Sequence, residues 1–88
     1  MAATPNRATQ SLAASQKGDV ILIQRILFEG LRARCSALDI FEGELLRCRA
    51  STASQLLLET PRGRVVSLER DWSRFIQVTT QPSAAVLP

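Results

Sequence analysis

The sequence predicts a small, mainly β domain that closes into a barrel and carries one short helix near its start. Three observations support this prediction. Apolar and polar residues alternate with a period of two over much of the second half of the chain, as they do in half-buried strands. Short turn motifs with glycine or proline separate these segments. At 88 residues the chain has room for one hydrophobic core and no second domain.

The first strand is expected at Val20–Ile26, an apolar, β-branched segment that follows a Gly-Asp turn. A helical pattern comes next, because Leu31, Cys35 and Leu38 stand at positions i, i+4 and i+7 and so share one face of a two-turn helix. Asp39 is expected to end this helix, since aspartate tolerates the left-handed conformation better than most residues. A glycine four residues later supplies the next turn.

The remaining strands follow from the alternation. Their expected inward positions are Leu46, Cys48, Ala50, Leu56, Leu58, Val66 and Leu68, and a last short strand places Ile76 and Val78 inward. A polar loop at residues 51–54, a Thr-Pro-Arg-Gly turn at 60–63 and about one helical turn at 70–74 separate them. Five strands are too few to form two stacked sheets. Closure of a single sheet into a barrel leaves no unpaired edge strands and encloses the core. The sequence therefore predicts a small five-stranded SH3-like barrel with one short helix inserted after strand one.

The ends of the chain have a different composition. Residues 1–16 are rich in Ala, Ser, Thr and Gln, and residues 81–88 contain two prolines. Both segments offer few large apolar groups to offset the entropy of ordering. We therefore expect a flexible N-terminal lead-in over residues 1–16, the barrel domain over 17–80 and a flexible tail over 81–88.

The composition excludes several kinds of chemistry. The sequence contains no histidine, which removes the usual general base, the Ser–His and Cys–His nucleophile pairs and the most common transition-metal ligand. Its four glycines are isolated and form no phosphate-binding loop. We expect a protein that acts by binding, is not an enzyme, and has no catalytic residues, no cofactor and no metal site.

The two cysteines are expected in the core and not at a metal or redox site. Cys35 lies on the apolar face of the helix and Cys48 on the inward face of a strand, and free cysteine is among the most buried residue types. Two thiols make no disulfide framework, the longest apolar run is too short to span a bilayer, and no secretory signal opens the chain. These features predict a cytoplasmic protein without direct membrane insertion.

Arginines occur in two pairs, Arg47 with Arg49 and Arg62 with Arg64, which could bind phosphates. The formal net charge of +3 is compatible with an anionic partner. However, acidic residues are interspersed, and only 5% of residues are aromatic, so few rings are available for stacking bases. A solvated outer face is favoured over nucleic-acid binding, and a small RNA- or nucleotide-binding barrel is the alternative.

The order of these features resembles the ferrous-iron transport protein A (FeoA) domain. Residues 31–43, LRARCSALDIFEG, resemble the helix and turn that lead into the second strand of that family. Residues 63–68 match its pattern of glycine, two spacers, an apolar residue, a small residue and leucine, and residues 76–78 match its closing Ile-x-Val. Gly18 fits the opening of its first strand. The resemblance covers residues 17–79 and carries mainly glycines and core positions, which are evidence for fold more than for function.

The resemblance implies a cytoplasmic adaptor that binds a membrane ferrous-iron transporter and modulates its uptake. Three positions depart from the family pattern without breaking the fold: Asp39 replaces glycine, Glu42 stands where proline or lysine is frequent, and Cys35 replaces a leucine-like residue. The same barrel is similar to the C-terminal domain of metal-dependent repressors of the diphtheria-toxin-repressor type. A structural module that forms a homodimer is a further alternative.

The candidate partner-binding residues are Phe28, Arg32 and Arg34. Leu31 and Cys35 are expected to pack one face of the helix against the core. Arg32 and Arg34 are therefore expected to face outward beside Phe28. An exposed ring flanked by arginines has the composition of a protein–protein hot spot. Two other apolar residues that the core pattern does not explain, Leu27 and Leu57, are further candidates for a partner or dimer surface.

Overall fold

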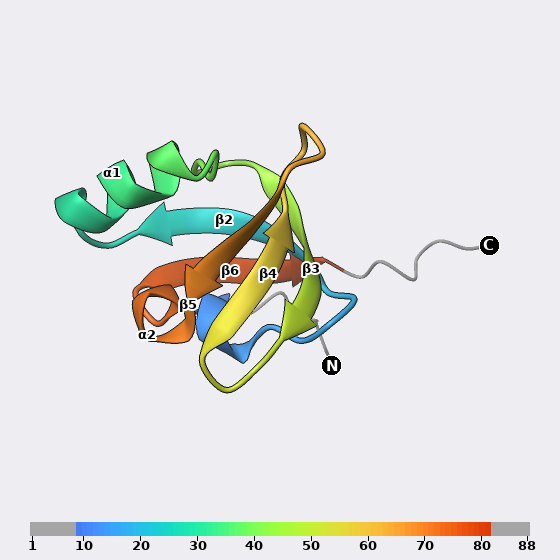
Figure 1. Ribbon diagram of the computed structural model, residues 1–88. Helices are drawn as coiled ribbons and strands as arrows, with labels where there is room; N and C mark the ends of the chain where they lie inside the picture. Colours follow the sequence, from blue (N-terminus) through green and yellow to red (C-terminus); the bar gives the residue numbers. More distant parts are fainter. Residues whose placement is uncertain (1–8, 82–88) are drawn as a thin grey trace, which may run out of the picture.

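The structure, a computed structural model, describes residues 9–81 of the chain (Figure 1). The strands are β1 (Thr9–Ser11), β2 (Val20–Ile26), β3 (Leu45–Ser51), β4 (Gln55–Glu59), β5 (Val65–Glu69) and β6 (Ile76–Gln81). The helices are the 3₁₀ turn η1 (Leu12–Ala14), the main helix α1 (Glu29–Ala37) and the single turn α2 (Arg70–Ser73). The mainly β class and the helix inserted after the first long strand are confirmed.

The strands form one antiparallel sheet in the order β1-β6-β2-β3-β4-β5. Its register shifts between Ile23 and Arg25 in β2 and between Cys48 and Ala50 in β3, and such bulges bend a strand and increase its twist. In Figure 1, β4 and β5 cross in front of β2 and β6 at a steep angle, while α1 lies beside the end of β2. The curled sheet encloses the core in the manner predicted for an SH3-like barrel.

The core is built from the apolar positions that alternate along the strands. The predicted inward side chains of β3 to β6 are buried, except for Ala50, which is half-buried after the register shift that follows Cys48. Leu31 and Cys35 of α1 are buried in the same cluster, and Leu38 packs against it. The period-two pattern and the helical stripe therefore predict the core correctly.

The domain begins earlier than the predicted residue 17. Strand β1 pairs with β6, with Gln10 opposite Val78, and the Leu12 side chain is completely buried. This strand raises the number of strands from the predicted five to six. Gln81, assigned to the tail from the sequence, belongs to β6. The other residues of the predicted lead-in and tail, 1–8 and 82–88, lie outside the described residues.

The loop after α1 has the backbone conformations that its sequence predicts. Asp39 adopts φ +70° and Gly43 φ +87°, both in the left-handed region. The N–H groups of Leu38 and Asp39 donate to carbonyls in the last turn of α1 and so close the helix. None of the helices within residues 9–81 is long and apolar enough to cross a membrane.

Candidate interaction surface

Arg32 and Arg34 lie on α1 and Phe28 directly precedes it, but the structure does not gather these three predicted partner-binding residues on one surface. Leu31 and Cys35 anchor the helix in the core. Successive residues are rotated by about 100°, so Arg32 and Arg34 lie on opposite flanks of this anchored stripe. Arg34 points toward α2, whereas Arg32 points toward the loop that precedes β3. Each flank therefore has its own surroundings.

Near the start of α1 and on its Arg34 flank, exposed rings from distant parts of the chain come together. The Phe28 and Phe75 rings meet edge to face with centroids 5.0 Å apart, a favourable geometry for aromatic pairs. The Arg34 guanidinium lies over the Trp72 ring, 5.9 Å from its centroid, within range of a cation–π interaction. We call Leu27, Phe28, Arg34, Trp72 and Phe75 the aromatic face.

The aromatic face is open to solvent although its members contact one another. Phe28 is 50% exposed, and Leu27, Trp72 and Phe75 are each more than one-third exposed. Two backbone hydrogen bonds hold its parts together: Leu27 N–H donates to the Phe75 carbonyl, and Phe75 N–H donates to the Trp72 carbonyl. Trp72, which lies on α2, leaves 39% of its surface accessible. Large exposed rings held on a rigid scaffold make a suitable binding surface.

On the other flank, Arg32 forms an ion pair with Glu42, with 3.2 Å between Nη1 and Oε1. The second carboxylate oxygen of Glu42 accepts a hydrogen bond of 2.8 Å from the backbone N–H of Ile26. This backbone hydrogen bond, together with the charge of Arg32, lowers the pKa of Glu42. Arg32 is thus engaged within the chain, on a flank that does not include Phe28.

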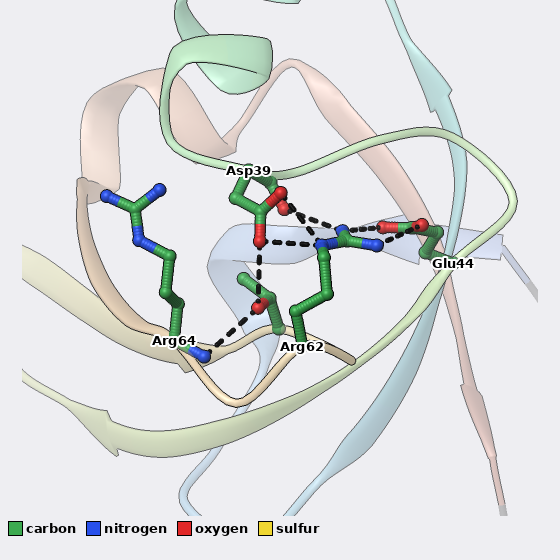
Figure 2. A network of polar contacts seen from close by, with 5 residues as sticks. Asp39, Glu44, Arg62 and Arg64 are labelled. Atoms are coloured by element: carbon green, nitrogen blue, oxygen red, sulfur yellow. Dashed lines mark hydrogen bonds and ion pairs between the residues drawn. The ribbon is translucent and has the colours of Figure 1, made fainter.

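A second polar cluster ties the β4–β5 turn to the loop after α1 (Figure 2). Arg62 Nε lies 2.8 and 2.7 Å from the two carboxylate oxygens of Asp39, and Arg62 Nη1 donates to Glu44 over 2.9 Å. Thr60 Oγ1 donates to Asp39 and accepts from the backbone N–H of Arg64. We call Arg62 with Asp39 and Glu44 the Arg62 clasp. Hydrogen bonds from Arg62 lower the pKa of both carboxyl groups.

The ion pairs weaken the case for a phosphate-binding surface. Arg62 is held between two carboxylates and also lies over the Phe41 ring, 5.5 Å from its centroid. Arg49 pairs with Glu59 at 2.7 Å. One member of each arginine pair considered in the sequence is therefore neutralised by an acidic side chain.

The cysteines occupy the core as predicted. Both thiols are free, and Cys35 and Cys48 are at most 1% exposed. Burial raises the pKa of Cys35 to about 11 and also raises the pKa of Cys48. Across residues 9–81, no three His, Cys, Asp or Glu side chains cluster in a way that could hold a metal ion. These thiols are structural core residues.

Comparison with known proteins places the chain by fold and not by sequence. No protein-family model and no curated protein matches it. A solved structure of an iron uptake regulatory protein (FeoA) has a TM-score of 0.77 at 13% identity, with 84% of this chain and 100% of that chain covered. An FeoA-like protein from Clostridium acetobutylicum has a TM-score of 0.72 at 17% identity, with 82% and 86% covered.

A manganese-dependent transcriptional repressor is similar over only part of its length. The TM-score is 0.77 at 20% identity, and the match covers 88% of this chain but 44% of the repressor chain. The FeoA structures, in contrast, are covered over most or all of their length. The chain therefore has an FeoA-like fold of the SH3-like class.

Proposed function

We propose that this chain is a cytoplasmic accessory protein of ferrous-iron uptake, which docks on a membrane ferrous-iron transporter and modulates its activity. The observation that carries the proposal is the match to an iron uptake regulatory protein over the whole of that protein's chain. The absence of histidine supports a role in binding over one in catalysis. The module acts through its surface and performs no chemistry of its own.

The aromatic face is the docking surface in this proposal. It offers the residue types that dominate binding energy at protein interfaces, which are Trp, aromatic rings and Arg. Arg34 forms no ion pair with a carboxylate within residues 9–81, so its charge is available to an acidic group of the partner. Phe28, the most exposed ring, would lose its remaining contact with water in the complex.

The proposal is tested by binding to the ferrous-iron transporter of the source organism, reconstituted in lipid nanodiscs. The double variant Phe28→Ala/Arg34→Glu removes the ring and reverses the charge. Loss of a hot-spot residue costs about 2 kcal/mol or more, so we expect affinity to fall at least about thirtyfold. Biolayer interferometry with immobilised nanodiscs measures the change.

The matched control is Val65→Ala/Lys17→Glu, which shortens one exposed apolar side chain and reverses one exposed charge, both outside the aromatic face. The control should bind as the wild type does, and both double variants should keep the wild-type circular dichroism spectrum. Absence of saturable binding by the wild type would refute the proposed partner. Equal binding by the wild type and a folded Phe28→Ala/Arg34→Glu variant would refute the proposed surface.

A further inference from the structure

Strand β2 has one unpaired stretch of edge where β3 diverges from it. The last backbone contacts on this side link Ile23 to Glu44 and Gly43. After the bulge that follows Ile23, Ile26 lies opposite Ile76 of β6. The neighbouring hydrogen bond from Leu27 N–H to the Phe75 carbonyl identifies Ile26–Ile76 as a non-hydrogen-bonded pair of the ladder. The N–H and C=O groups of Ile26 therefore point away from β6, toward the open edge.

Two side chains satisfy these backbone groups in place of a neighbouring strand. Glu42 Oε2 accepts from Ile26 N–H at 2.8 Å, and Arg32 Nη2 donates to the Ile26 carbonyl at 3.4 Å. The same two side chains are joined by their own ion pair, 3.2 Å long. We call Arg32 and Glu42 the edge plug, because together they supply the acceptor and the donor that one residue of a paired strand would supply.

The edge plug is held weakly enough to be displaced. The side chains of Arg32 and Glu42 are 50% and 33% exposed, and ion pairs this accessible contribute little net stability. The contact from Arg32 to the Ile26 carbonyl is long for a hydrogen bond. When the two side chains swing outward, they can remain paired with each other in solvent, so displacement leaves no buried charge without a partner.

A groove of about 490 Å³ opens directly over the plug. Ile26, Arg32 and Glu42 line it together with Glu29, Ala33 and Ser36 of α1 and the exposed ring of Phe41. Its volume falls within the usual range of binding clefts. The helix wall carries the short side chains of Ala33 and Ser36, which allow another backbone to approach closely, and Phe41 offers an apolar contact on the opposite side.

We propose that this groove binds an extended peptide segment of a partner protein as a short strand added to β2. One residue of the peptide lies opposite Ile26, accepts its N–H and donates to its carbonyl, and so replaces both members of the edge plug. A peptide is favoured as the occupant because its backbone presents one donor and one acceptor side by side, which is the pair that Ile26 requires. This inference rests on the edge and the groove alone and does not depend on the proposed transporter.

The test begins with selection of random nine-residue peptides, displayed on phage, against the immobilised full-length chain. The most enriched peptide is synthesised and titrated by fluorescence anisotropy. Ala33→Trp fills the groove from an exposed helix position and should weaken binding at least about tenfold. Ala37→Trp, an equally exposed site on α1 outside the groove lining, should leave affinity unchanged.

Glu42→Ala provides a second test, in which peptide binding should become tighter and not weaker. This variant removes the carboxylate with which the peptide competes for Ile26 N–H, so binding should tighten by about three- to tenfold. In the NMR spectrum, the Ile26 amide should shift on peptide binding, and its hydrogen exchange should slow.

Four results would overturn the inference: no enriched peptide, equal affinity of wild type and Ala33→Trp, binding that leaves the Ile26 amide unperturbed, or loss of peptide binding in the variant Phe28→Ala/Arg34→Glu. The variant Phe28→Ala/Arg34→Glu should bind the peptide as tightly as wild type. A failure of transporter binding can thereby be distinguished from a failure of peptide binding in the groove.

Discussion

Truncation of Leu12 should destabilise the domain strongly, although this residue lies in a segment whose composition predicts no structure. The Leu12 side chain is completely buried, and η1 contacts both β6 and α2. Arg70 also donates to the Ala13 carbonyl at 2.7 Å, which ties the same segment to α2. Leu→Ala changes in cores cost about 2–5 kcal/mol through lost transfer energy and the cavity left behind, and we expect about 3 kcal/mol here.

This loss is a large fraction of the total, since a domain of this size is stable by about 4–11 kcal/mol. It corresponds to a decrease in Tm of about 12–24 °C. Urea unfolding followed by circular dichroism measures the change, with Leu45→Ala as the control because Leu45 is 49% exposed on β3. The control should cost about 1 kcal/mol or less. An equally small cost for Leu12→Ala would show that the N-terminal segment is not part of the core.

Three further predictions concern the core, the turns and the Arg62 clasp. Cys35, buried and with its pKa raised to about 11, should react with a disulfide reagent in the native state far more slowly than in urea; fast native labelling would contradict the core assignment. Gly63→Ala should lower the free energy of unfolding by about 1 kcal/mol or more, because Gly63 adopts φ +86°. Gly30→Ala within α1 should instead raise it by up to about 1 kcal/mol. Chemical unfolding measures both changes, and changes of the same sign would refute the backbone argument. The clasp carboxylates have lowered pKa values in the folded state, so they stabilise the fold above their ordinary pKa and lose this contribution as the pH falls through the lowered value. Arg62→Met should therefore flatten the loss of Tm with acidification between about pH 5 and pH 2 relative to wild type, while Arg74→Met should not, and parallel profiles would count against the clasp.

The sequence predicts strands β3, β4 and β5 well because each of them has one buried and one solvated face. The alternation around Leu56 and Leu58 follows directly from the period of a strand, and both side chains are fully buried. The end of α1 is equally local, since the left-handed conformation of Asp39 depends on its own side chain and on the helix before it. Elements with a strong local pattern need no information from distant parts of the chain.

Strand β1 lacks such a pattern. Thr9–Ser11 is short and polar, and its pairing with β6 joins segments from the two ends of the domain. Leu12 was the one available signal, because it is the only large aliphatic residue between positions 2 and 16. A single apolar residue defines no period, so only the tertiary structure reveals that this segment completes the core.

The candidate surface could be predicted in part. The exposure of Phe28 and Arg34 follows from the helical stripe, but Phe75 and Trp72 join them only through the fold. The separation of Arg32 from Arg34 could have been found from helix geometry, because residues two apart are rotated by about 200°. The edge plug and the Arg62 clasp could not, since the plug joins a helix to a loop and the clasp joins two different loops.

Iron uptake in cells tests the central claim most directly. The gene is deleted in the source organism, and the initial rate of ⁵⁵Fe²⁺ uptake is measured after complementation, with equal protein levels verified by immunoblot. We expect the rate to change on deletion and to return to the wild-type value with the wild-type chain and with Val65→Ala/Lys17→Glu, but not with Phe28→Ala/Arg34→Glu. An unchanged rate on deletion, or full restoration by Phe28→Ala/Arg34→Glu, would contradict a role in ferrous-iron uptake through the aromatic face.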